Sequence, residues 1–374
     1  MKFIHLSDLH IGKTVNGYSM IEDQRFIIKQ ILNIIDETKA NAVLISGDIY
    51  DKSVPSAEAV TVFDEFLTEL CRRPIDTLII SGNHDSAERL SFGEKIFEQN
   101  GLHISPVFTG SIKTVTLSDD FGAVNFYLLP FIKPSMIRKY FPNIDITDTN
   151  SALKTVLSGI NVDSTVRNVL LCHQFVTGAT KSESEEIFVG GSDNVNISLF
   201  APFDYTALGH LHMPQTLGDN YVRYCGSPLK YSFSEAARDK SVTLVEMNEK
   251  DNITVTEYPL NPLHDMRELK GSYEQITAVG YNDPSPSDYV HITLTDEIPD
   301  PGALSKLREF YPNIMKLDYD NMQTRHFEEI SGADSIANKT PTELFCELYK
   351  SQNGDDLSDD MTKIINEIFE QTED

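Results

Sequence analysis

Apolar residues in the first hundred positions form two alternating patterns. Short apolar runs at 3–6, 42–45 and 78–80, interrupted only by His5, have the length of buried strands. Between them, apolar side chains recur at helical spacing. These helical positions are Ile27, Ile31, Ile34 and Ile35 in one stretch and Val60, Phe63, Leu67 and Leu70 in the next. The alternation of strand and helix predicts a largely parallel sheet with helices on its outer face.

Shorter strand-like runs follow the first hundred residues. They fall between about 112 and 130 and between 203 and 258, and they include 124–129, 221–225 and 242–247. A second sheet packed on the first would accommodate them. The hydrophobic pattern alone indicates only a mixed α/β fold.

Two prolines, Pro259 and Pro262, introduce a polar stretch that we interpret as a domain boundary. The sequence after it predicts a small α/β unit, with strands at 289–294 and 314–317 and a short helix at 301–310. We therefore expect three parts. They are a main domain over 1–260, a capping domain over 261–330 and a terminal segment over 331–374.

The terminal segment carries two amphipathic patterns, separated by the turn signal Asn353-Gly354. Their apolar positions are Leu344, Phe345, Leu348 and Tyr349 in the first and Leu357, Met361, Ile364, Ile365, Ile368 and Phe369 in the second. Both patterns predict helices. Residues 331–374 contain 11 Asp and Glu but 3 Lys and Arg, a net charge of −8. The helix pair either folds back on the rest of the chain or lies against a basic surface of a partner.

The composition indicates where the protein works. Of the 374 residues, 40% are hydrophobic, enough to bury a full core without disulfides. The four cysteines lack CxxC spacing, which is typical of reduced thiols in the cytoplasm. No apolar signal region precedes Asp8, and no window approaches the roughly 18 apolar residues of a membrane span. We therefore expect a cytoplasmic protein without membrane contact.

Polar residues follow five of the predicted strands directly. They are Asp8, His10, Asp48, Asn83, His84, His173, His210 and His212. One such residue at a strand end is usually a cap or a surface group, but five strand ends with this chemistry in one chain make coincidence a poor explanation. Carboxylate, imidazole and amide oxygen suit manganese, iron, cobalt or zinc better than calcium. The set is sufficient for two metal ions that share a carboxylate, an arrangement typical of phosphate-ester hydrolases.

These motifs, in this order, resemble those of the calcineurin-like metallophosphoesterases. The sequence Gly-Asp-Ile-Tyr-Asp at 47–51, the first motif so close to Met1 and the organisation of the C-terminal third make the chain similar to the bacterial SbcD nuclease subunits. The resemblance is strong over 1–260 and rests on organisation after that. It implies a four-layer α/β/β/α sandwich with a small α/β capping domain, a C-terminal helix pair and metal ions at one end of the sandwich.

Carried over position by position, the resemblance assigns the ligands of two divalent metal ions. The set consists of Asp8, His10 and His212 for one ion, Asn83, His173 and His210 for the other, and Asp48 as the bridge between them. The resemblance implies manganese, whereas the ligand types alone do not choose among the transition metals.

Two further residues are expected to take part in the reaction. His84 follows Asn83 directly and would face the metal ions without binding them. A protonated imidazole there can donate to the leaving oxygen or stabilise the transition state. Asp51 stands where the archaeal and eukaryotic relatives have a histidine, and related phosphatases pair the equivalent aspartate with the Asn-His histidine. We expect an Asp51–His84 pair that favours the charged imidazole. The alternative is that Asp51 caps a loop.

The resemblance implies a manganese-dependent DNA nuclease, acting as a 3′→5′ double-strand exonuclease and as an endonuclease at hairpins and single strands in DNA repair and recombination. Its partner would be an SbcC-like coiled-coil ATPase, in a heterotetramer that contains a homodimer of this chain. The sequence has no Walker motif, so any ATP dependence would come from that partner. One alternative is a phosphoesterase for small phosphodiesters or phosphoproteins, although such enzymes usually end soon after the Gly-His-x-His segment. Another is an inactive scaffold, which would have lost ligands.

The net charge of −26 argues against a simple DNA-coating surface. Bound cations would offset part of this charge, and a partner protein could supply a basic surface. Basic residues near the motifs either contact backbone phosphates or are ordinary solvated side chains. They are Lys13, Lys52, Arg89, Lys181 and Lys230.

Overall fold

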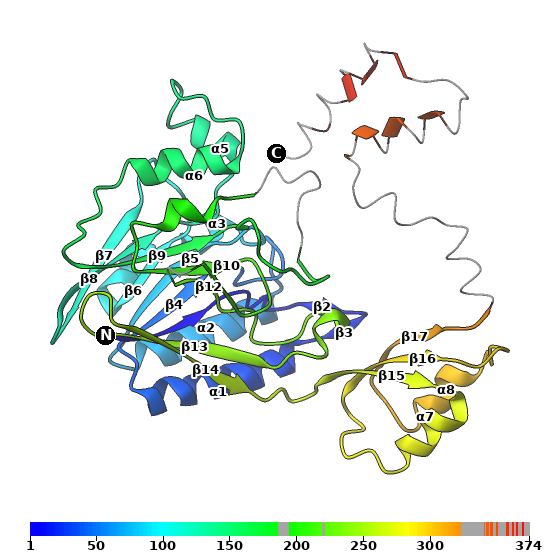
Figure 1. Cartoon of the computed structure of the whole chain (residues 1–374). Helices are drawn as coiled ribbons and strands as arrows, with labels where there is room; N and C mark the ends of the chain where they lie inside the picture. The colour runs from blue at the N-terminus through cyan, green and yellow to red at the C-terminus, as the bar shows by residue number, and fades with distance from the viewer. Residues whose placement is uncertain are drawn as a thin grey trace.

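The computed structural model describes residues 1–185, 194–218, 221–322 and part of 340–369. Within them, two six-stranded sheets pack face to face, and helices cover the outer face of each (Figure 1). A three-stranded sheet lies beside this sandwich and carries its own helices (Figure 1).

The first sheet has the strand order β14-β13-β1-β4-β5-β6. Its strands are β1 (Lys2–Leu6), β4 (Ala42–Ser46), β5 (Asp76–Ile80), β6 (Leu102–Ser105), β13 (Lys240–Met247) and β14 (Ile253–Leu260). β1, β4, β5 and β6 are parallel, whereas β13 runs antiparallel to β1 and to β14. β4 is buried along its whole length, which explains its uninterrupted apolar run. The strands predicted at 3–6, 42–45 and 78–80 are confirmed.

The second sheet has the strand order β11-β12-β10-β9-β8-β7. Its strands are β7 (Lys113–Asp119), β8 (Gly122–Leu128), β9 (Arg167–His173), β10 (Tyr205–Gly209), β11 (Gln215–Leu217) and β12 (Val222–Tyr224). The four inner strands are parallel, and the edge strands β7 and β11 are antiparallel to their neighbours. The short strands expected between 112 and 130 and between 203 and 225 therefore do form a second sheet. The run predicted at 242–247 does not join it, because as β13 it forms antiparallel ladders with β1 and β14 in the first sheet.

Apolar side chains from both sheets fill the space between them. Phe3 of β1 meets Phe126 of β8 and Tyr205 of β10 edge to face, with ring centroids 5.8 and 5.7 Å apart. All three are fully buried. Burying such a side chain contributes about 1.5–3 kcal/mol, and each edge-to-face pair adds about 0.5–1.5 kcal/mol. This interior fixes the two sheets against each other, and with them the strand ends that carry the site.

Helices α1 (Ile21–Thr38) and α2 (Ala57–Cys71) cover the outer face of the first sheet. The inward side of α2 is formed by Ala59, Val62, Phe63, Phe66 and Leu70. Val60 was predicted to face inward, but 45% of its surface is exposed. The stripe centres on the side of the helix that Ala59 and Phe66 share, so Val60 falls on the flank.

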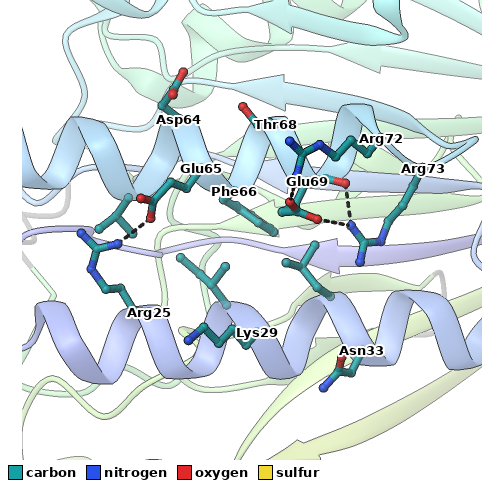
Figure 2. Close-up of a pocket in the computed structure, with 13 residues that line it drawn as sticks. Arg25, Lys29, Asn33, Asp64, Glu65, Phe66, Thr68, Glu69, Arg72 and Arg73 are labelled. Carbon is teal, nitrogen blue, oxygen red and sulfur yellow. Dashed lines mark hydrogen bonds and ion pairs between the residues drawn. The ribbon is translucent and has the colours of Figure 1, made fainter.

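A groove of about 700 Å³ runs between α1 and α2 on the outer surface (Figure 2). Arg25 of α1 donates to Glu65 of α2 across it at 2.5 Å, and Arg73 lies 3.3 Å from Glu69 (Figure 2). Carboxylates therefore neutralise these guanidinium groups, and the groove offers little net positive charge for a phosphate chain.

Helices α5 (Pro134–Arg138) and α6 (Thr149–Ser158) cover the outer face of the second sheet (Figure 1). The 3₁₀ turn η2 (Ile197–Phe200) packs against the same core. α6 begins with a reciprocal capping box between Asp148 and Ser151, which satisfies two free backbone N–H groups at its start. The layers thus follow the order helix, sheet, sheet, helix, as the four-layer α/β/β/α expectation requires.

The small sheet consists of three parallel strands, β15 (Met266–Gly271), β16 (Tyr289–Leu294) and β17 (Ile314–Tyr319), with helices α7 (Tyr273–Gly280) and α8 (Ala303–Leu307) packed on one face. Its contact with the sandwich centres on Asp23 of α1. That buried carboxylate accepts from the Tyr289 hydroxyl at 2.8 Å and from the His264 backbone N–H at 3.1 Å.

The remaining named elements are short. They are β2 (Thr14–Val15), β3 (Tyr18–Ser19), α3 (Ala87–Leu90), α4 (Glu94–Phe97), η1 (Glu98–Asn100) and η3 (Phe233–Glu235). The residues described within 342–350 and 361–369 have helical backbone, and the rings of Phe345 and Phe369 meet with centroids 6.3 Å apart. Of the predicted apolar stripes, Leu344, Leu348 and Ile368 lie outside the described residues. No helix in the described part of the chain is long and apolar enough to cross a membrane.

Candidate metal centre

The residues predicted for the site lie where strands of the two central sheets end. Segments after β1, β4 and β5 of the first sheet supply Asp8, His10, Asp48, Asn83 and His84, and β9 and β10 of the second supply His173, His210 and His212. Parallel strands end at a common edge, and the packing of the sheets brings the two edges together. The structure therefore gathers the whole predicted set in one place.

The backbone at four of these positions is left-handed. φ is 53° at Asp8, 43° at His10, 51° at Asp48 and 102° at His210. Aspartate and histidine occur in this region several times more often than most residues other than glycine. Gly47 also has a positive φ, and a Cβ there would lie 2.5 Å from His173 Nδ1. The sharp turns after the strands thus aim the ligand side chains inward and leave no room for a larger residue at 47.

Asp8, His10 and His212 form the first cluster, with one ligand atom of each within 4.8 Å of the others. The Nε2 atoms of His10 and His212 face each other at 3.1 Å. The Asp8 carboxylate accepts from Ser7 Oγ at 2.5 Å and from the His210 backbone N–H at 3.1 Å. All three ligand side chains are buried, so their orientation is fixed by the surrounding protein.

Asn83, His173 and His210 form the second cluster. The amide oxygen of Asn83 lies 3.1 Å from His173 Nε2 and 3.0 Å from His210 Nδ1. His173 Nδ1 donates to the backbone carbonyl of Ser46 at 2.7 Å, which fixes the tautomer and turns Nε2 toward the cluster.

Asp48 lies between the two clusters. Its Oδ2 atom is 3.2 Å from His173 Nε2 and 3.8 Å from His10 Nε2. Its Oδ1 atom accepts from the His84 backbone N–H at 3.0 Å. One carboxylate thus reaches a histidine of each cluster, the position that a bridging ligand must take.

Burial and charge act on the protonation states of these groups in different ways. Burial raises the pKa of Asp8 to about 6 and lowers that of His210 to about 3. Burial also acts to raise the pKa of Asp48, but His173 overrides it and holds that pKa well below the usual range. Burial acts to lower the pKa of His173, and Asp48 raises it instead to about 9. The two shifts favour a charged imidazole beside a charged carboxylate, so a metal ion that binds His173 Nε2 must displace a proton.

The residues present fit a pair of divalent transition-metal ions. Two imidazole nitrogens that face each other at 3.1 Å, beside a carboxylate that can only accept, form a site that a cation satisfies. Imidazole, carboxylate and amide oxygen are ligand types that such metals take. The three clusters found among the described histidines, cysteines and acidic residues all belong to this centre.

The predicted Asp51–His84 pair needs a correction. His84 Nδ1 donates to the backbone carbonyl of Asp51 at 3.0 Å, and the Asp51 carboxylate accepts from Lys13 Nζ at 2.8 Å instead. The turn after β4 points the carbonyl toward the imidazole, and the lysine takes the side chain. His84 still faces the centre, with its ring 4.8 Å from the ring of His10.

Sequence reasoning missed two residues that hold the site in shape. The Asp85 carboxylate accepts from the backbone N–H groups of Ile49, Tyr50 and Gly82 at 2.9–3.1 Å, which ties the loops after β4 and β5 together. Gln24 of α1 donates to the His10 carbonyl at 2.7 Å. Asp85 belongs to the Gly-Asn-His-Asp motif and so could have been found, whereas nothing in the sequence marks Gln24.

Comparison with known proteins identifies the family. Residues 1–214 match the family model for calcineurin-like phosphoesterases, and residues 262–353 match one described as a type 5 capsule protein repressor C-terminal domain. The SbcD subunit of the SbcCD nuclease from Staphylococcus epidermidis is 33% identical over 96% of this chain and 95% of that protein. Its counterpart from Staphylococcus saprophyticus is 32% identical over 99% of this chain and 98% of that protein. The chain belongs to the SbcD nuclease family.

Membership of the SbcD family makes the chain a metal-dependent nuclease subunit with a calcineurin-like phosphoesterase domain. The family resemblance and the fold class inferred from the sequence are confirmed. Among solved structures, a dimetal phosphatase from Danio rerio matches 69% of this chain and 95% of its own length, with 12% sequence identity and a TM-score of 0.43.

Proposed function

We propose that this SbcD-family chain hydrolyses DNA phosphodiester bonds with two manganese ions, as a 3′→5′ double-strand exonuclease and as an endonuclease at hairpins and single strands. It works in the cytoplasm with an SbcC-like ATPase in DNA repair and recombination. The observation that supports the chemistry best is the convergence of seven ligand-type side chains from five strand ends of two sheets.

In this proposal each cluster holds one ion and Asp48 is shared. The bound ions would supply an activated water and Lewis-acid stabilisation of the phosphoryl oxygens. The protein's own contribution is orientation and proton transfer. His84 keeps its Nδ1–H on the Asp51 carbonyl, so its Nε2 is the atom that donates a proton to the leaving 3′-oxygen. Because the ring is held by backbone, it needs no reorientation during the reaction.

Two aromatic rings at the edge of the centre favour a nucleic-acid substrate. Phe131 lies edge-on to His173 at 6.2 Å between ring centroids, and Phe175 lies edge-on to His210 at 6.5 Å. Both phenylalanines are partly exposed. Unstacked bases bind to such rings without sequence preference. We propose that they hold the bases next to the cleaved phosphate.

Two of the five basic residues near the motifs are held in ion pairs in the described structure, and three are exposed. Lys13 donates to Asp51 at 2.8 Å, and Lys230 pairs with Asp265 at 2.8 Å. Lys52, Arg89 and Lys181 are exposed. With a net charge of −26, the chain needs its partner to provide much of the basic DNA surface.

The nuclease proposal is tested with a labelled DNA duplex, a DNA hairpin and bis-p-nitrophenyl phosphate. We expect manganese-dependent cleavage of all three, with release of 3′-end nucleotides from the duplex, and stimulation by ATP only when the ATPase partner is added. Cleavage of the small ester without cleavage of DNA, in the presence of the partner, would refute the DNA proposal.

We further propose that the terminal segment, 331–374, docks on the coiled coil of the ATPase, and that the complex is a heterotetramer built on a homodimer of this chain. Support comes from the ring contact between Phe345 and Phe369, which joins the two predicted helices, and from the net charge of −8 of the whole segment 331–374.

The docking proposal is tested by removing residues 331–374. The shortened protein should keep its melting temperature and manganese-dependent cleavage of small DNA substrates, and should no longer copurify with the ATPase. Wild-type affinity for the ATPase, or loss of folding, would show that the segment serves another purpose.

A further inference from the structure

A chain of polar groups lies behind His212, outside the ligand set; its two ends are buried and its middle member, Ser184, is half-buried. His212 Nδ1 lies 2.6 Å from the hydroxyl of Ser184, and that hydroxyl lies 2.6 Å from Oε1 of Glu235. Glu235, in the 3₁₀ turn η3, is completely buried, and His212 is 1% exposed. A carboxylate is thus connected to the outer nitrogen of a proposed ligand through one side-chain hydroxyl.

The charge of Glu235 is neutralised by Lys240 at the start of β13. The lysine ammonium donates to the Glu235 carboxylate, to the His212 carbonyl at 2.8 Å and to Ser227 Oγ at 2.9 Å. Lys240 is 4% exposed. Burying two charges carries a desolvation penalty that their attraction must offset, and an apolar pair of similar size is often as stabilising or more so. Stability alone therefore explains the Glu235–Lys240 pair poorly. Its contacts with His212, direct from Lys240 and through Ser184 from Glu235, indicate a role in holding that histidine.

The backbone of His212 is held by the same short segment that holds its ring. Glu185 Oε1 accepts from the His212 backbone N–H at 2.7 Å, and the other carboxylate oxygen accepts from the backbone N–H of Ser182. By comparison, the outer nitrogen of His173, Nδ1, donates only to the backbone carbonyl of Ser46. His212 thus receives a support built from side chains, and substitutions can remove it.

Counting protons fixes the direction of these hydrogen bonds. The Glu235 carboxylate is paired with an ammonium and can only accept, so the Ser184 hydroxyl donates its one proton to it. Ser184 Oγ then accepts from His212 Nδ1–H, and its second lone pair is available to Ser182 Oγ at 2.8 Å. This leaves His212 Nε2 without a proton, facing His10 Nε2 across 3.1 Å. That is the tautomer a metal ion needs.

We propose that Ser184 and Glu235 are positioning residues that hold His212 in the orientation and tautomer required to bind the first metal ion. The inference rests on the proposed ligand set of Asp8, His10 and His212. It predicts that deleting the Ser184 hydroxyl lowers the affinity for the first metal ion only. The second cluster makes no contact with this chain of groups in the described structure.

The experiment measures Mn²⁺ binding to the full-length protein, by calorimetry for the two affinities and by electron paramagnetic resonance for the coupled ion pair. Ser184→Ala should weaken the first ion by about 10–100-fold, the usual effect of losing such a partner, and leave the second unchanged. The spectrum should change from a coupled pair to a single ion at limiting metal. Ser184→Thr keeps the hydroxyl and should restore binding. Ser158→Ala, a matched hydroxyl deletion on helix α6 of the outer layer, should behave as wild type.

A second variant tests the charged end of the chain of groups. Glu235→Gln combined with Lys240→Met removes the buried pair together and so avoids leaving one charge alone. It should fold and should also weaken the first ion selectively. The inference would be overturned if Ser184→Ala bound each ion with wild-type affinity. It would also be overturned if the substitution weakened the binding of both ions equally. If wild-type protein bound no pair of ions, the proposed function would fail instead, which keeps the two failures distinct.

Discussion

Asp48→Asn tests the shared ligand directly, and its effect can be estimated from His173. Burial acts to lower the pKa of His173, yet Asp48, with a smaller contribution from Asp8, raises it from 6.5 to about 9. Because burial acts in the opposite direction, this net shift is a lower bound on the attraction for one positive charge at this position, about 3 kcal/mol or more, which is roughly 10²-fold or more in affinity. A divalent ion carries twice the charge, while the amide oxygen of asparagine keeps part of the coordination. We expect both manganese affinities to fall by at least roughly 10² and cleavage to be lost at ordinary metal concentrations.

The assay is titration of Mn²⁺ by calorimetry, followed by cleavage of an end-labelled duplex over a range of metal concentrations. Asp120→Asn, at an exposed turn between β7 and β8, is the matched control and should match wild type. Melting in chelator should show that Asp48→Asn is folded. Two ions bound with wild-type affinity, or cleavage at the wild-type rate, would refute the shared position of Asp48.

Three further outcomes follow from the geometry, and a fourth from the charge of the centre. His84→Ala should keep both ions and slow cleavage by about 10²–10⁴-fold. Asp51→Asn should leave the alkaline limb of the pH–rate profile in place, because the Asp51 backbone carbonyl holds His84. A shifted limb would show instead that the Asp51 carboxylate acts on His84. Gly209→Ala should destabilise the protein by about 3 kcal/mol or more in urea unfolding, since its Cβ would lie 2.0 Å from the Ser46 carbonyl, and a wild-type midpoint would contradict this. Manganese affinity should fall as pH drops below the His173 pKa of about 9, with release of about one proton per protein near neutral pH in calorimetry; no release would contradict the charged His173 imidazole.

The sequence predicted the elements that are buried on both faces and those with strong periodicity. The apolar runs at 42–45 in β4 and 169–172 in β9 are uninterrupted because helices or the opposite sheet cover both faces of these strands. The inward face of α2 was wrong at Val60, because apolar residues on a helix flank are tolerated at the surface and blur the stripe. Sheet order was beyond the sequence, because it depends on long-range pairings such as β1 with β13.

For the site, the sequence predicted the residue types at the strand ends, and the structure brings them together. It did not predict their supports. Asp51 was expected to act through its carboxylate, yet its backbone carbonyl contacts His84, and a sequence carries no signal for which atom a turn will present. Glu235 and Gln24 come from segments that are remote in sequence from the motifs, so only the folded chain shows that they contact ligands or their neighbours.

The left-handed backbone at the ligand positions bears on how such a protein can evolve or be engineered. Outside glycine, this conformation costs about 1–2 kcal/mol per residue, and Asp8, His10, Asp48 and His210 all adopt it. Glycine would adopt it without that cost. Selection for heat resistance in the presence of chelator would therefore favour glycine at the very positions that bind metal. Directed evolution that selects for melting temperature alone would raise thermal stability at the expense of nuclease activity. Screens of this family should therefore include metal in every round.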